Sequence, residues 1–489
     1  MSDVPHVIVC GAGLTGLTTA WQLRRSGIDV TVLEASDMVG GVIRTTRRDG
    51  YLVEQGPNSC TLTGELASLV DALDLTPQLR RAAPQAQRRY IVRNGRALAV
   101  PASPLAMIRS PLFSTADKLR VLAEPFIGRR TDAATDESVA AFVRRRLGTE
   151  LLTWAVDPFV SGVYAGDPEQ LSVRHAFPRL AAMERDHGSL VRGMIAASRS
   201  GRASSPNAGP ESRRHTMVSF ADGMATLPLA LVDDIGPANV MLRTRVVAIR
   251  RDEDGLMVTV DRGGAHVDLR ADAVVSTLPL HAFSQLALGA AAADAQAALG
   301  TIPYPAVVSL ALGFRRADVA HPLDGFGCLV PSAEHRRTLG VLFSSTLFDE
   351  RAPEGQVLLT CFLGGVRQPE IAALSTDALV ELVQPELAAL LGVTGAPTFV
   401  ERTVWPRAIP QYNVGHDRAA HAADAIEASV PGLLVDGQFR RGVSVGDCVA
   451  SGATIAARTL VLAQQNAATR ARRGARQPLE TPVAPAAVA

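Results

Sequence analysis

The chain has 489 residues, more than one ordinary hydrophobic core holds, so at least two domains are expected. Its 49 basic and 48 acidic side chains leave a formal net charge of +1, which removes the electrostatic reason to expect a nucleic-acid partner. Small molecules are the expected ligands.

The cysteines stand singly, without the close spacing of a metal site or a disulfide framework. They favour a reducing cytoplasm and give no reason to expect a metal. A strand-like run begins at residue 6, which leaves no room for a signal peptide. No apolar run is expected to approach the ~18 to 20 residues of a membrane-spanning helix. We therefore expect a cytoplasmic protein, soluble or peripheral on the cytoplasmic face of a membrane.

The first elements expected along the chain form a strand–helix–strand unit. Residues 6–10 are a short apolar run that glycines end, 14–25 carry apolar residues at helical spacing, and 29–33 return to β-branched alternation. The sequence between strand and helix matches G-x-G-x-x-G, whose glycines allow a tight turn, the approach of a pyrophosphate and close helix packing. We therefore expect a dinucleotide to contact Gly11, Gly13, Leu14, Thr15 and Gly16.

Glu34 closes the second strand at roughly the 20-residue distance where a carboxylate holds a ribose hydroxyl. An acid at this position disfavours NADP, because it would repel the additional phosphate. The sequence therefore predicts a Rossmann-type domain that binds a dinucleotide without a 2′-phosphate.

Helical periodicity between prolines predicts a mainly helical segment over 91–199, and a Ser-, Arg- and Gly-rich stretch predicts a flexible loop over 198–215. Strand-like runs then dominate, which is typical of an α+β fold on a mixed sheet. Residues 467–489 have no apolar period, so we expect a disordered tail. The expected helices cover 66–81, 116–126, 138–146, 151–156, 291–299 and 376–391, and the strands 240–260, 267–276, 306–314, 338–343 and 357–362.

The continuation of the nucleotide motif, residues 34–45, reads EASDMVGGVIRT. It resembles the E-A-x-x-R-x-G-G-x-x-R-T run of the amine oxidase and protoporphyrinogen oxidase superfamily, and this resemblance implies FAD. Met38 departs from the pattern, since the family usually has arginine there, and the departure puts the affinity for FAD in doubt. The additional FAD contacts that the resemblance implies here are Ala35, Gly40, Gly41 and Arg44.

Further blocks extend the resemblance from about residue 6 to residue 460, and together they resemble the oxygen-dependent protoporphyrinogen IX oxidase family. Gln438 and Gly446 depart from that family's pattern close to the expected flavin. On the residues alone Val246 is an ordinary core residue; the resemblance adds a contact to adenine. The blocks are 53–59, 88–92, 100–104, 161–168, 176–180, 325–327, 339–340, 362–365, 409–412 and 441–445. They imply FAD contacts at Gly56, Pro57, Asn58, Val246, Val443, Ser444 and Val445.

The resemblance implies oxidation of protoporphyrinogen IX to protoporphyrin IX, with hydride transfer to FAD and O2 as the final acceptor. No catalytic side chain is expected, because flavin N5 accepts the hydride and no protein nucleophile is needed. Arg89 would pair with a substrate propionate. The other expected substrate contacts, which on the residues alone read as strand core or turns, are Gly162, Ala165, Gly166, Leu329, Val330, Leu342, Phe362 and Tyr412.

The expected fold class is α/β and α+β: a Rossmann-type FAD-binding domain, a substrate domain on a mixed sheet and a mainly helical segment. Within that helical segment, 106–108 and 111–113 offer apolar residues near Arg109 and Lys118, which predicts a membrane contact, a homodimer surface or core. The boundaries are 1–78, 238–290 and 428–466 for the FAD-binding domain, 79–90, 216–237 and 291–427 for the substrate domain, and 91–199 for the helical segment.

Three other functions remain open at the level of sequence. Oxidation of coproporphyrinogen III would need more cations around the cavity, because that substrate carries more carboxylates. An amine or carotenoid oxidase of the same superfamily would share the N-terminal motifs. A flavin- or porphyrin-binding protein without turnover is the third alternative.

Overall fold

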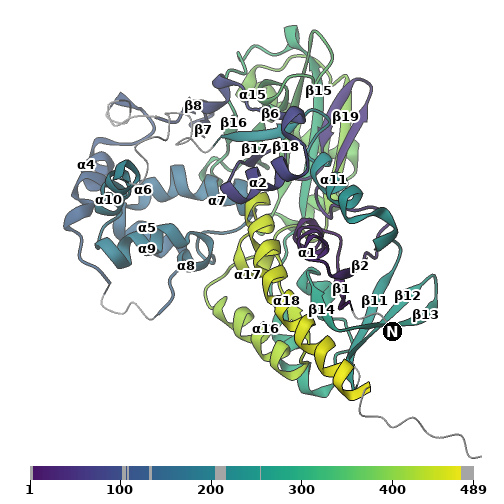
Figure 1. Ribbon diagram of the computed structural model, residues 1–489. Helices are drawn as coiled ribbons and strands as arrows, with labels where there is room; N and C mark the ends of the chain where they lie inside the picture. Colours follow the sequence, from purple (N-terminus) through teal and green to yellow (C-terminus); the bar gives the residue numbers. More distant parts are fainter. Residues whose placement is uncertain are drawn as a thin grey trace, which may run out of the picture.

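The computed structural model describes residues 4–101, 106, 109–130, 135–203, 216–253 and 255–474. They form three parts: a domain around a parallel sheet, a domain around a larger mixed sheet, and a helical lobe beside them (Figure 1). We call these the parallel-sheet domain, the mixed-sheet domain and the helical lobe.

The parallel-sheet domain contains a five-stranded sheet in the order β10-β2-β1-β14-β20, with every neighbouring pair parallel. The predicted strand–helix–strand unit is confirmed residue for residue as β1, α1 and β2. Side chains of β1 and β14 are buried on both faces, which is why these strands read as continuous apolar runs. The bounds are β1 His6–Cys10, α1 Leu14–Arg25, β2 Asp29–Leu33, β10 Val240–Met241, β14 Ala273–Ser276 and β20 Leu433–Val435.

Two layers cover this sheet. On one face α1 packs with α11 (Thr226–Ile235) and the long helix α18 (Val445–Gly474). On the other face lie α13 (Ala293–Gly300), α16 (Asp417–Ser429) and a three-stranded antiparallel sheet. The strands of that sheet are β11 Arg245–Asp252, β12 Gly255–Arg262 and β13 Ala265–Ala271.

Helix α18 corrects the expectation that no segment is long and apolar enough to cross a membrane. Among the described residues, Val445–Arg470 passes that test by length and composition, although half of the stretch is buried inside the protein. A Cβ added at Gly452 would lie 2.8 Å from the carbonyl oxygen of Thr15, so the backbones of α18 and α1 approach closely. Ile455 is fully buried in the same core. Packing on α1 thus buries part of the apolar side of α18.

The mixed-sheet domain holds a seven-stranded sheet in the order β19-β15-β18-β17-β16-β7-β8. All neighbours are antiparallel except β16 and β7. Helix α15 (Thr376–Leu391) packs on one face, where its leucines join the buried residues of the strands. The strands are β7 Tyr90–Arg93, β8 Arg96–Ala99, β15 Val307–Arg315, β16 Gly327–Leu329, β17 Thr338–Leu342, β18 Gln356–Gly364 and β19 Phe399–Trp405.

Smaller elements join the two sheet domains. Strands β3 and β4 form a hairpin, and β9 pairs with both β5 and β6. The bounds are β3 Thr45–Arg48, β4 Tyr51–Glu54, β5 Cys60–Thr61, β6 Leu79–Arg81 and β9 Met217–Phe220. The remaining helices here are α2 Gly64–Ala72, α12 Leu280–Phe283, α14 Ser344–Leu347 and α17 Gln438–Arg441.

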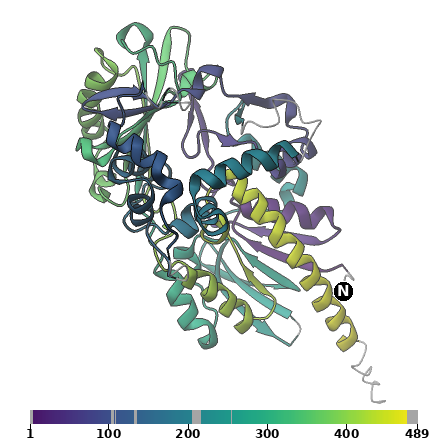
Figure 2. The same ribbon diagram turned by 90° about the vertical axis from the view of Figure 1, so that its left-hand side faces the viewer.

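The helical lobe faces the viewer in Figure 2 and has a small core of its own around Phe142, Val160 and Leu171. A π-helical turn, η4, leads into α7, which reaches from the lobe toward the mixed sheet (Figure 1). The elements are α4 Thr115–Ala123, η3 Glu124–Phe126, α5 Val139–Arg146, α6 Thr149–Leu151, η4 Leu152–Val156, α7 Asp157–Tyr164, α8 Val173–Ala176, α9 Pro178–His187 and α10 Leu190–Ala203.

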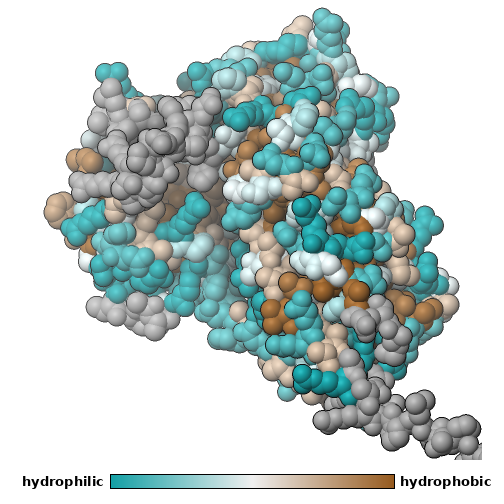
Figure 3. All heavy atoms as spheres, viewed as in Figure 1, coloured by the Kyte–Doolittle hydropathy of each residue, from teal (hydrophilic) through white to brown (hydrophobic). Residues whose placement is uncertain are grey.

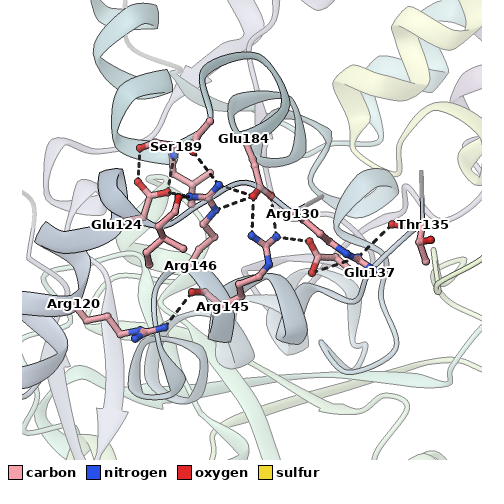
Figure 4. Close-up of polar contacts among 12 residues, drawn as sticks. Arg120, Glu124, Arg130, Thr135, Glu137, Arg145, Arg146, Glu184 and Ser189 are labelled. Carbon is pink, nitrogen blue, oxygen red and sulfur yellow. Dashed lines mark hydrogen bonds and ion pairs between the residues drawn. The ribbon is translucent and has the colours of Figure 1, made fainter. Parts of the chain in front are cut away.

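A polar network crosses the lobe at the level of α5 (Figure 4). The fully buried Arg146 donates to Glu124 at 3.1 Å and to Glu184 at 2.5 Å. Arg145 also pairs with Glu184, at 2.7 Å. Glu124 in turn accepts hydrogen bonds from Ser189 and from the first backbone N–H groups of α10. One connected set of charges therefore joins η3, α5, α9 and α10.

Several predicted boundaries are wrong. Residues 91–99 belong to the mixed sheet, because β7 pairs in parallel with β16. Residues 216–237 pack on the parallel-sheet domain, where Trp21 donates to Asp234 at 2.6 Å. Residues 198–203 continue α10 and 467–474 continue α18. In the second stretch Ala and Arg sustain a helix without apolar periodicity. The rest of the predicted loop and tail, 204–215 and 475–489, lies outside the described residues.

For the apolar residues at 111–113, where the sequence left a membrane contact, a homodimer surface or core open, the structure supports core. Leu112 and Phe113 are buried against Ile91, because this segment folds back over the mixed sheet. Met107 and Ile108 lie outside the described residues. Among the described residues, the most exposed apolar side chains of the lobe lie on α4 and η3: Leu119, Leu122 and Phe126 are 61%, 71% and 86% exposed.

Candidate functional site

The N-terminus of α1 lies at the carboxyl edge of the parallel sheet. Gly13 is its N-cap, no side chain caps the first turn, and no acidic residue lies there. The N–H groups of that turn are therefore available to an anion, and the helix dipole favours negative charge. Gly11 has φ +103°, and a Cβ at Gly16 would lie 2.0 Å from the carbonyl oxygen of Gly11. Only glycine fits either position.

A second glycine pair closes over this helix terminus. Gly40 donates to the carbonyl of Ala12 at 2.8 Å and forms a bridge with Gly13. A Cβ at Gly41 would lie 3.4 Å from the Cα of Gly13, whereas one at Gly13 would meet nothing within 4 Å. The chain thus leaves open space at Gly13, bordered by backbone, and this arrangement fits a pyrophosphate.

Glu34 follows β2 directly and its carboxylate is held in place by backbone. One oxygen accepts from the N–H of Ala12 at 2.9 Å and the other from the N–H of Ser36 at 2.9 Å. Each carboxylate oxygen keeps a further lone pair, so the group can also accept hydrogen bonds from ribose hydroxyls. Met38, where an arginine was expected, is 43% exposed. Ala35 lies in the exposed turn between Glu34 and Ser36.

Val246 is buried beside the same corner of the domain. It belongs to the core that includes Leu33, and the N–H of Thr244 donates to the carbonyl of Glu34 at 2.8 Å. The structure thus gives Val246 the core position that its sequence alone indicated, next to Glu34. Its contact with adenine remains a proposal.

Arg44 lies where the parallel-sheet domain meets the mixed sheet. Its Nε donates to the carbonyl of Gly41 at 3.1 Å, and its guanidinium lies 5.3 Å from the centre of the Trp405 ring. No carboxylate in the described part of the chain pairs with it. Trp405 donates to the carbonyl of Gln55 at 2.7 Å, which ties the end of β19 to the segment before Gly56.

Gly56 also admits no other residue, because a Cβ there would lie 1.9 Å from the carbonyl oxygen of Val42. Asn58 donates back to the carbonyl of Gly56 at 3.3 Å across Pro57 and makes a tight local turn. The three predicted contacts Gly56, Pro57 and Asn58 therefore lie together, close to Arg44.

The chain returns to this region before α18. Ser444 caps the helix, because its hydroxyl accepts from the N–H of Asp447 at 3.1 Å. Val443 packs on the lobe core and Val445 on the core of the parallel-sheet domain. Since α18 crosses α1 at Thr15, the beginnings of the two helices lie side by side (Figure 1). The predicted contacts from the two ends of the sequence are thus brought together.

Four predicted substrate residues share the face of the mixed sheet that α15 does not cover. Leu329 and Phe362 both lie opposite Gly340, which has no side chain to separate them. Leu342 packs in one cluster with Phe362 and Phe326. Arg89 precedes β7 and its guanidinium lies 5.5 Å from the centre of the Phe326 ring. The surface is hollowed between the lobe and the rest of the molecule (Figure 3).

Val330 was expected to contact the substrate as well, but the structure gives it the strand-core position that its sequence alone indicated. It is 4% exposed in the core on the α15 side of the sheet, together with Leu379. Adjacent residues of an extended chain point to opposite faces, so Leu329 and Val330 cannot share a ligand on one face.

Arg89 differs from its neighbour Arg88 in how its charge is used. Arg88 forms an ion pair with Asp324. The exposed Arg89 pairs with no carboxylate among the described residues and rests only on Phe326. An apolar face with one uncommitted guanidinium at its edge suits a large apolar ligand that carries a carboxylate.

Helix α7 brings backbone against this face. A Cβ at Gly162 would lie 2.5 Å from Cδ2 of Leu329, so α7 sits directly on that side chain. Ala165 has φ +51° and its carbonyl accepts from the N–H of Val366 at 2.9 Å. A Cβ at Gly166 would lie 2.4 Å from Oε1 of Gln411. The predicted Gly162, Ala165 and Gly166 therefore belong to one closely packed wall.

Tyr412 is buried in the lobe core, and its hydroxyl donates to the carbonyl of Gln438. His416 bonds the next carbonyl, that of Phe439, at 2.7 Å. Burial raises the pKa of Tyr412 and lowers the pKa of His416, so both side chains are neutral near pH 7. Tyr412 thus anchors α17, a packing role that the sequence left open beside a role in the cavity.

Sequence reasoning missed two aromatic residues at the edges of the face, Phe326 and Trp405. Phe326 stands in the block 325–327, but its position beneath Arg89 depends on the pairing of β16 with β7. Trp405 ends β19, a strand that the sequence analysis did not predict, and it carries no local signal of its partners. Among the described residues, no group of three His, Cys, Asp or Glu side chains could hold a metal.

Comparison with known proteins matches residues 14–460 to the family described as flavin containing amine oxidoreductase. Protoporphyrinogen oxidase 2 of Arabidopsis thaliana is 34% identical over 468 residues, which cover 91% of this chain and 92% of that protein. The chain belongs to this flavin-dependent family. Coproporphyrinogen III oxidase of Bacillus subtilis is 28% identical, with 92% of this chain and 97% of that protein covered.

A crystal structure described as a putative protoporphyrinogen oxidase from Exiguobacterium sp. 255-15 has the same fold. Its TM-score is 0.78 at 24% identity, over 94% of this chain and 99% of that one. The predicted fold class and the FAD cofactor are confirmed. The protein is an FAD-dependent oxidoreductase, and the open space at Gly13, the fixed carboxylate of Glu34 and the unpaired Arg44 fit that cofactor.

Proposed function

We propose that this flavoenzyme oxidises protoporphyrinogen IX to protoporphyrin IX, with O2 as the final acceptor. The names of its relatives support a porphyrinogen substrate. The observation that carries the proposal is the apolar face of the mixed sheet with the uncommitted Arg89 at its edge.

In this proposal, different side chains bind the ring, orient it and hold the cofactor. Leu329, Leu342 and Phe362 contact the porphyrinogen ring and exclude water. Gly162 lets the backbone of α7 lie close to the ring. Arg89 pairs with a propionate and fixes the orientation of the ring. FAD, when bound, supplies the acceptor for the hydride. Glu34, Arg44, Gly56 and the start of α18 hold the cofactor beside the face.

The distribution of charge favours protoporphyrinogen over coproporphyrinogen. A substrate with more carboxylates requires more cations around its cavity. Arg93, which lies on the same side of the sheet as Arg89 by strand order, is already paired with Glu150 at 2.8 Å. Arg88 is likewise paired, with Asp324. Arg89 alone among these three arginines is uncommitted.

The test is steady-state oxidation by the purified holoenzyme in air, followed by porphyrin fluorescence and oxygen consumption. We expect kcat/KM for protoporphyrinogen IX to exceed that for coproporphyrinogen III by at least about tenfold, which corresponds to roughly 1.4 kcal/mol. A higher kcat/KM for coproporphyrinogen III would identify that compound as the substrate in place of protoporphyrinogen IX. If neither compound is oxidised, the remaining alternatives are an amine or carotenoid oxidase and a flavin- or porphyrin-binding protein without turnover.

We also propose that the apolar patch of Leu119, Leu122 and Phe126 contacts the cytoplasmic face of a membrane. Figure 3 shows hydrophobic atoms at the outer edge of the lobe. Apolar residues on one side of a surface helix, with basic residues around them, are typical of interfacial binding. Phe126→Asp should reduce co-sedimentation with anionic vesicles. If the wild-type protein does not bind vesicles but forms a dimer, and Phe126→Asp disrupts that dimer, the patch is a dimer surface.

A further inference from the structure

One arginine outside the predicted site holds both ends of α7. Arg367 follows β18 and donates through one nitrogen to Asp157, at 2.6 Å, and through another to Asp167, at 3.0 Å. Asp157 is the first residue of α7, and Asp167 follows the left-handed turn at Ala165 that ends the helix. A single planar guanidinium therefore fixes the start of the helix and the chain beyond its end.

Two further bonds tie the same helix to the mixed sheet. The other carboxylate oxygen of Asp157 accepts from the N–H of Ser332 at 2.9 Å, just beyond the end of β16. The N–H of Val366 donates to the carbonyl of Ala165 at 2.9 Å. We call these contacts of Asp157, Ala165, Asp167, Ser332 and Arg367 the α7 clasp.

The α7 clasp lies next to the candidate substrate face without being part of it. Ser332 follows Leu329 closely in sequence, and Arg367 follows Phe362. Between them Gly162 rests on Leu329, so a shift of α7 moves this wall relative to the apolar face. Asp157 is 6% exposed in its side chain and Arg367 30%, so the pair is partly shielded from solvent.

We propose that Arg367 is a positioning residue: through the α7 clasp it keeps α7 seated on Leu329 and so fixes the wall that the porphyrinogen contacts. This inference rests on the proposed function for the identity of the ligand. Arg367 need not touch the substrate or FAD. Its loss should weaken ligand binding while the cofactor stays bound.

The variants are Arg367→Gln, which removes the charge, and Arg367→Lys, which keeps the charge but not the fork. For Arg367→Gln we expect an unchanged flavin-to-protein ratio, a KM for protoporphyrinogen about tenfold higher and a kcat within about threefold of wild type. Arg367→Lys should recover part of the loss. The control is Arg337→Gln, because Arg337 pairs with Glu370 on an exposed surface.

A variant of Asp157, the partner of Arg367, distinguishes loss of the α7 clasp from a general loss of stability. Asp157→Asn weakens the pair but can still accept from the N–H of Ser332. If the two side chains act as one unit, Arg367→Gln and Asp157→Asn together should raise KM no more than the larger single change. A KM unchanged within twofold in folded, yellow Arg367→Gln would overturn the proposal, and so would strictly additive effects.

A readout without substrate separates this inference from the proposed function. Hydrogen exchange in holoenzyme peptides that cover Asp157–Tyr164 should be faster in Arg367→Gln than in wild type and unchanged in Arg337→Gln. If wild type does not oxidise protoporphyrinogen, the proposed function fails while this comparison still tests the α7 clasp. Equal exchange in wild type and Arg367→Gln would overturn the α7 clasp itself.

Discussion

Single side chains in the site differ in whether their charge is already used within the protein. Glu34 is fixed by two backbone N–H groups yet keeps lone pairs for a ligand. Arg44 and Arg89 rest on aromatic rings and pair with no carboxylate in the part of the chain that the structure describes. Each of these groups therefore offers a charge to a ligand without first breaking an ion pair.

Replacing Glu34 tests the hold on FAD. Glu34→Ala should purify largely free of flavin, since it removes a charge-assisted hydrogen bond that contributes roughly 1.5 to 3 kcal/mol. The measurement is the ratio of flavin to protein absorbance after gel filtration. Asp37→Ala is the matched control, because Asp37 is an exposed carboxylate in the same loop. A fully yellow Glu34→Ala protein would contradict the assignment.

Replacing Arg89 tests the anchor for the substrate. Arg89→Ala should keep its flavin and raise KM for protoporphyrinogen more than it lowers kcat, because an anchor used equally in ground and transition states contributes uniform binding. The loss in kcat/KM should be a factor of roughly ten to a hundred and fifty. Arg88→Ala, which breaks the exposed pair with Asp324, should leave the kinetics unchanged. Equal kinetics for Arg89→Ala and wild type would remove the propionate role.

At the scale of elements, the lobe is held together by charge as well as by its apolar core. Arg146 is fully buried between Glu124 and Glu184 (Figure 4). Glu124→Ala leaves the fully buried Arg146 with Glu184 alone and takes the acceptor from Ser189 and the first N–H groups of α10, so it should cost about 3 to 5 kcal/mol of unfolding free energy. Urea unfolding measures this loss. Asp186→Ala, which breaks the exposed pair with Arg185, should change stability by less than about 1 kcal/mol.

The same network predicts a dependence on pH. Burial alone would raise the pKa of Glu184, but hydrogen bonds and charge from Arg145 and Arg146 outweigh it and lower the pKa from 4.5 to about 2. Ionised Glu184 therefore stabilises the lobe above about pH 4.5, and this contribution is lost as the pH falls toward 2. Glu184→Gln should flatten the fall in stability across that window. An equally steep fall in the variant would show that other carboxylates cause it.

The sequence predicted elements well where one local pattern decides the structure. The unit β1, α1 and β2 and the helix α15 match the expected bounds, because apolar periodicity and glycine punctuation fix them locally. The burial of Leu112 and the face on which Val330 lies could not be predicted, because they depend on how the chain folds back over the sheet and on strand register. Neither the register nor the fold-back is determined by a short stretch of sequence.

At the scale of the molecule, the site forms where segments far apart in sequence meet. Trp405 bonds to Gln55, and the start of α18 lies beside the start of α1. The motifs at both ends could be predicted, since each carries its own glycines. The roles of Phe326, Trp405 and Arg367 could not, because each depends on a tertiary contact between segments far apart in sequence.

The central claim is that porphyrinogen bound on the mixed-sheet face is oxidised by FAD held at the parallel-sheet domain. The most direct measurement is anaerobic mixing of the yellow holoenzyme with protoporphyrinogen IX, with flavin absorbance and porphyrin fluorescence recorded together. We expect the flavin to bleach as porphyrin forms and its colour to return when O2 is admitted. Porphyrin formation without bleaching, or no reaction by fully flavin-loaded protein, would contradict the account.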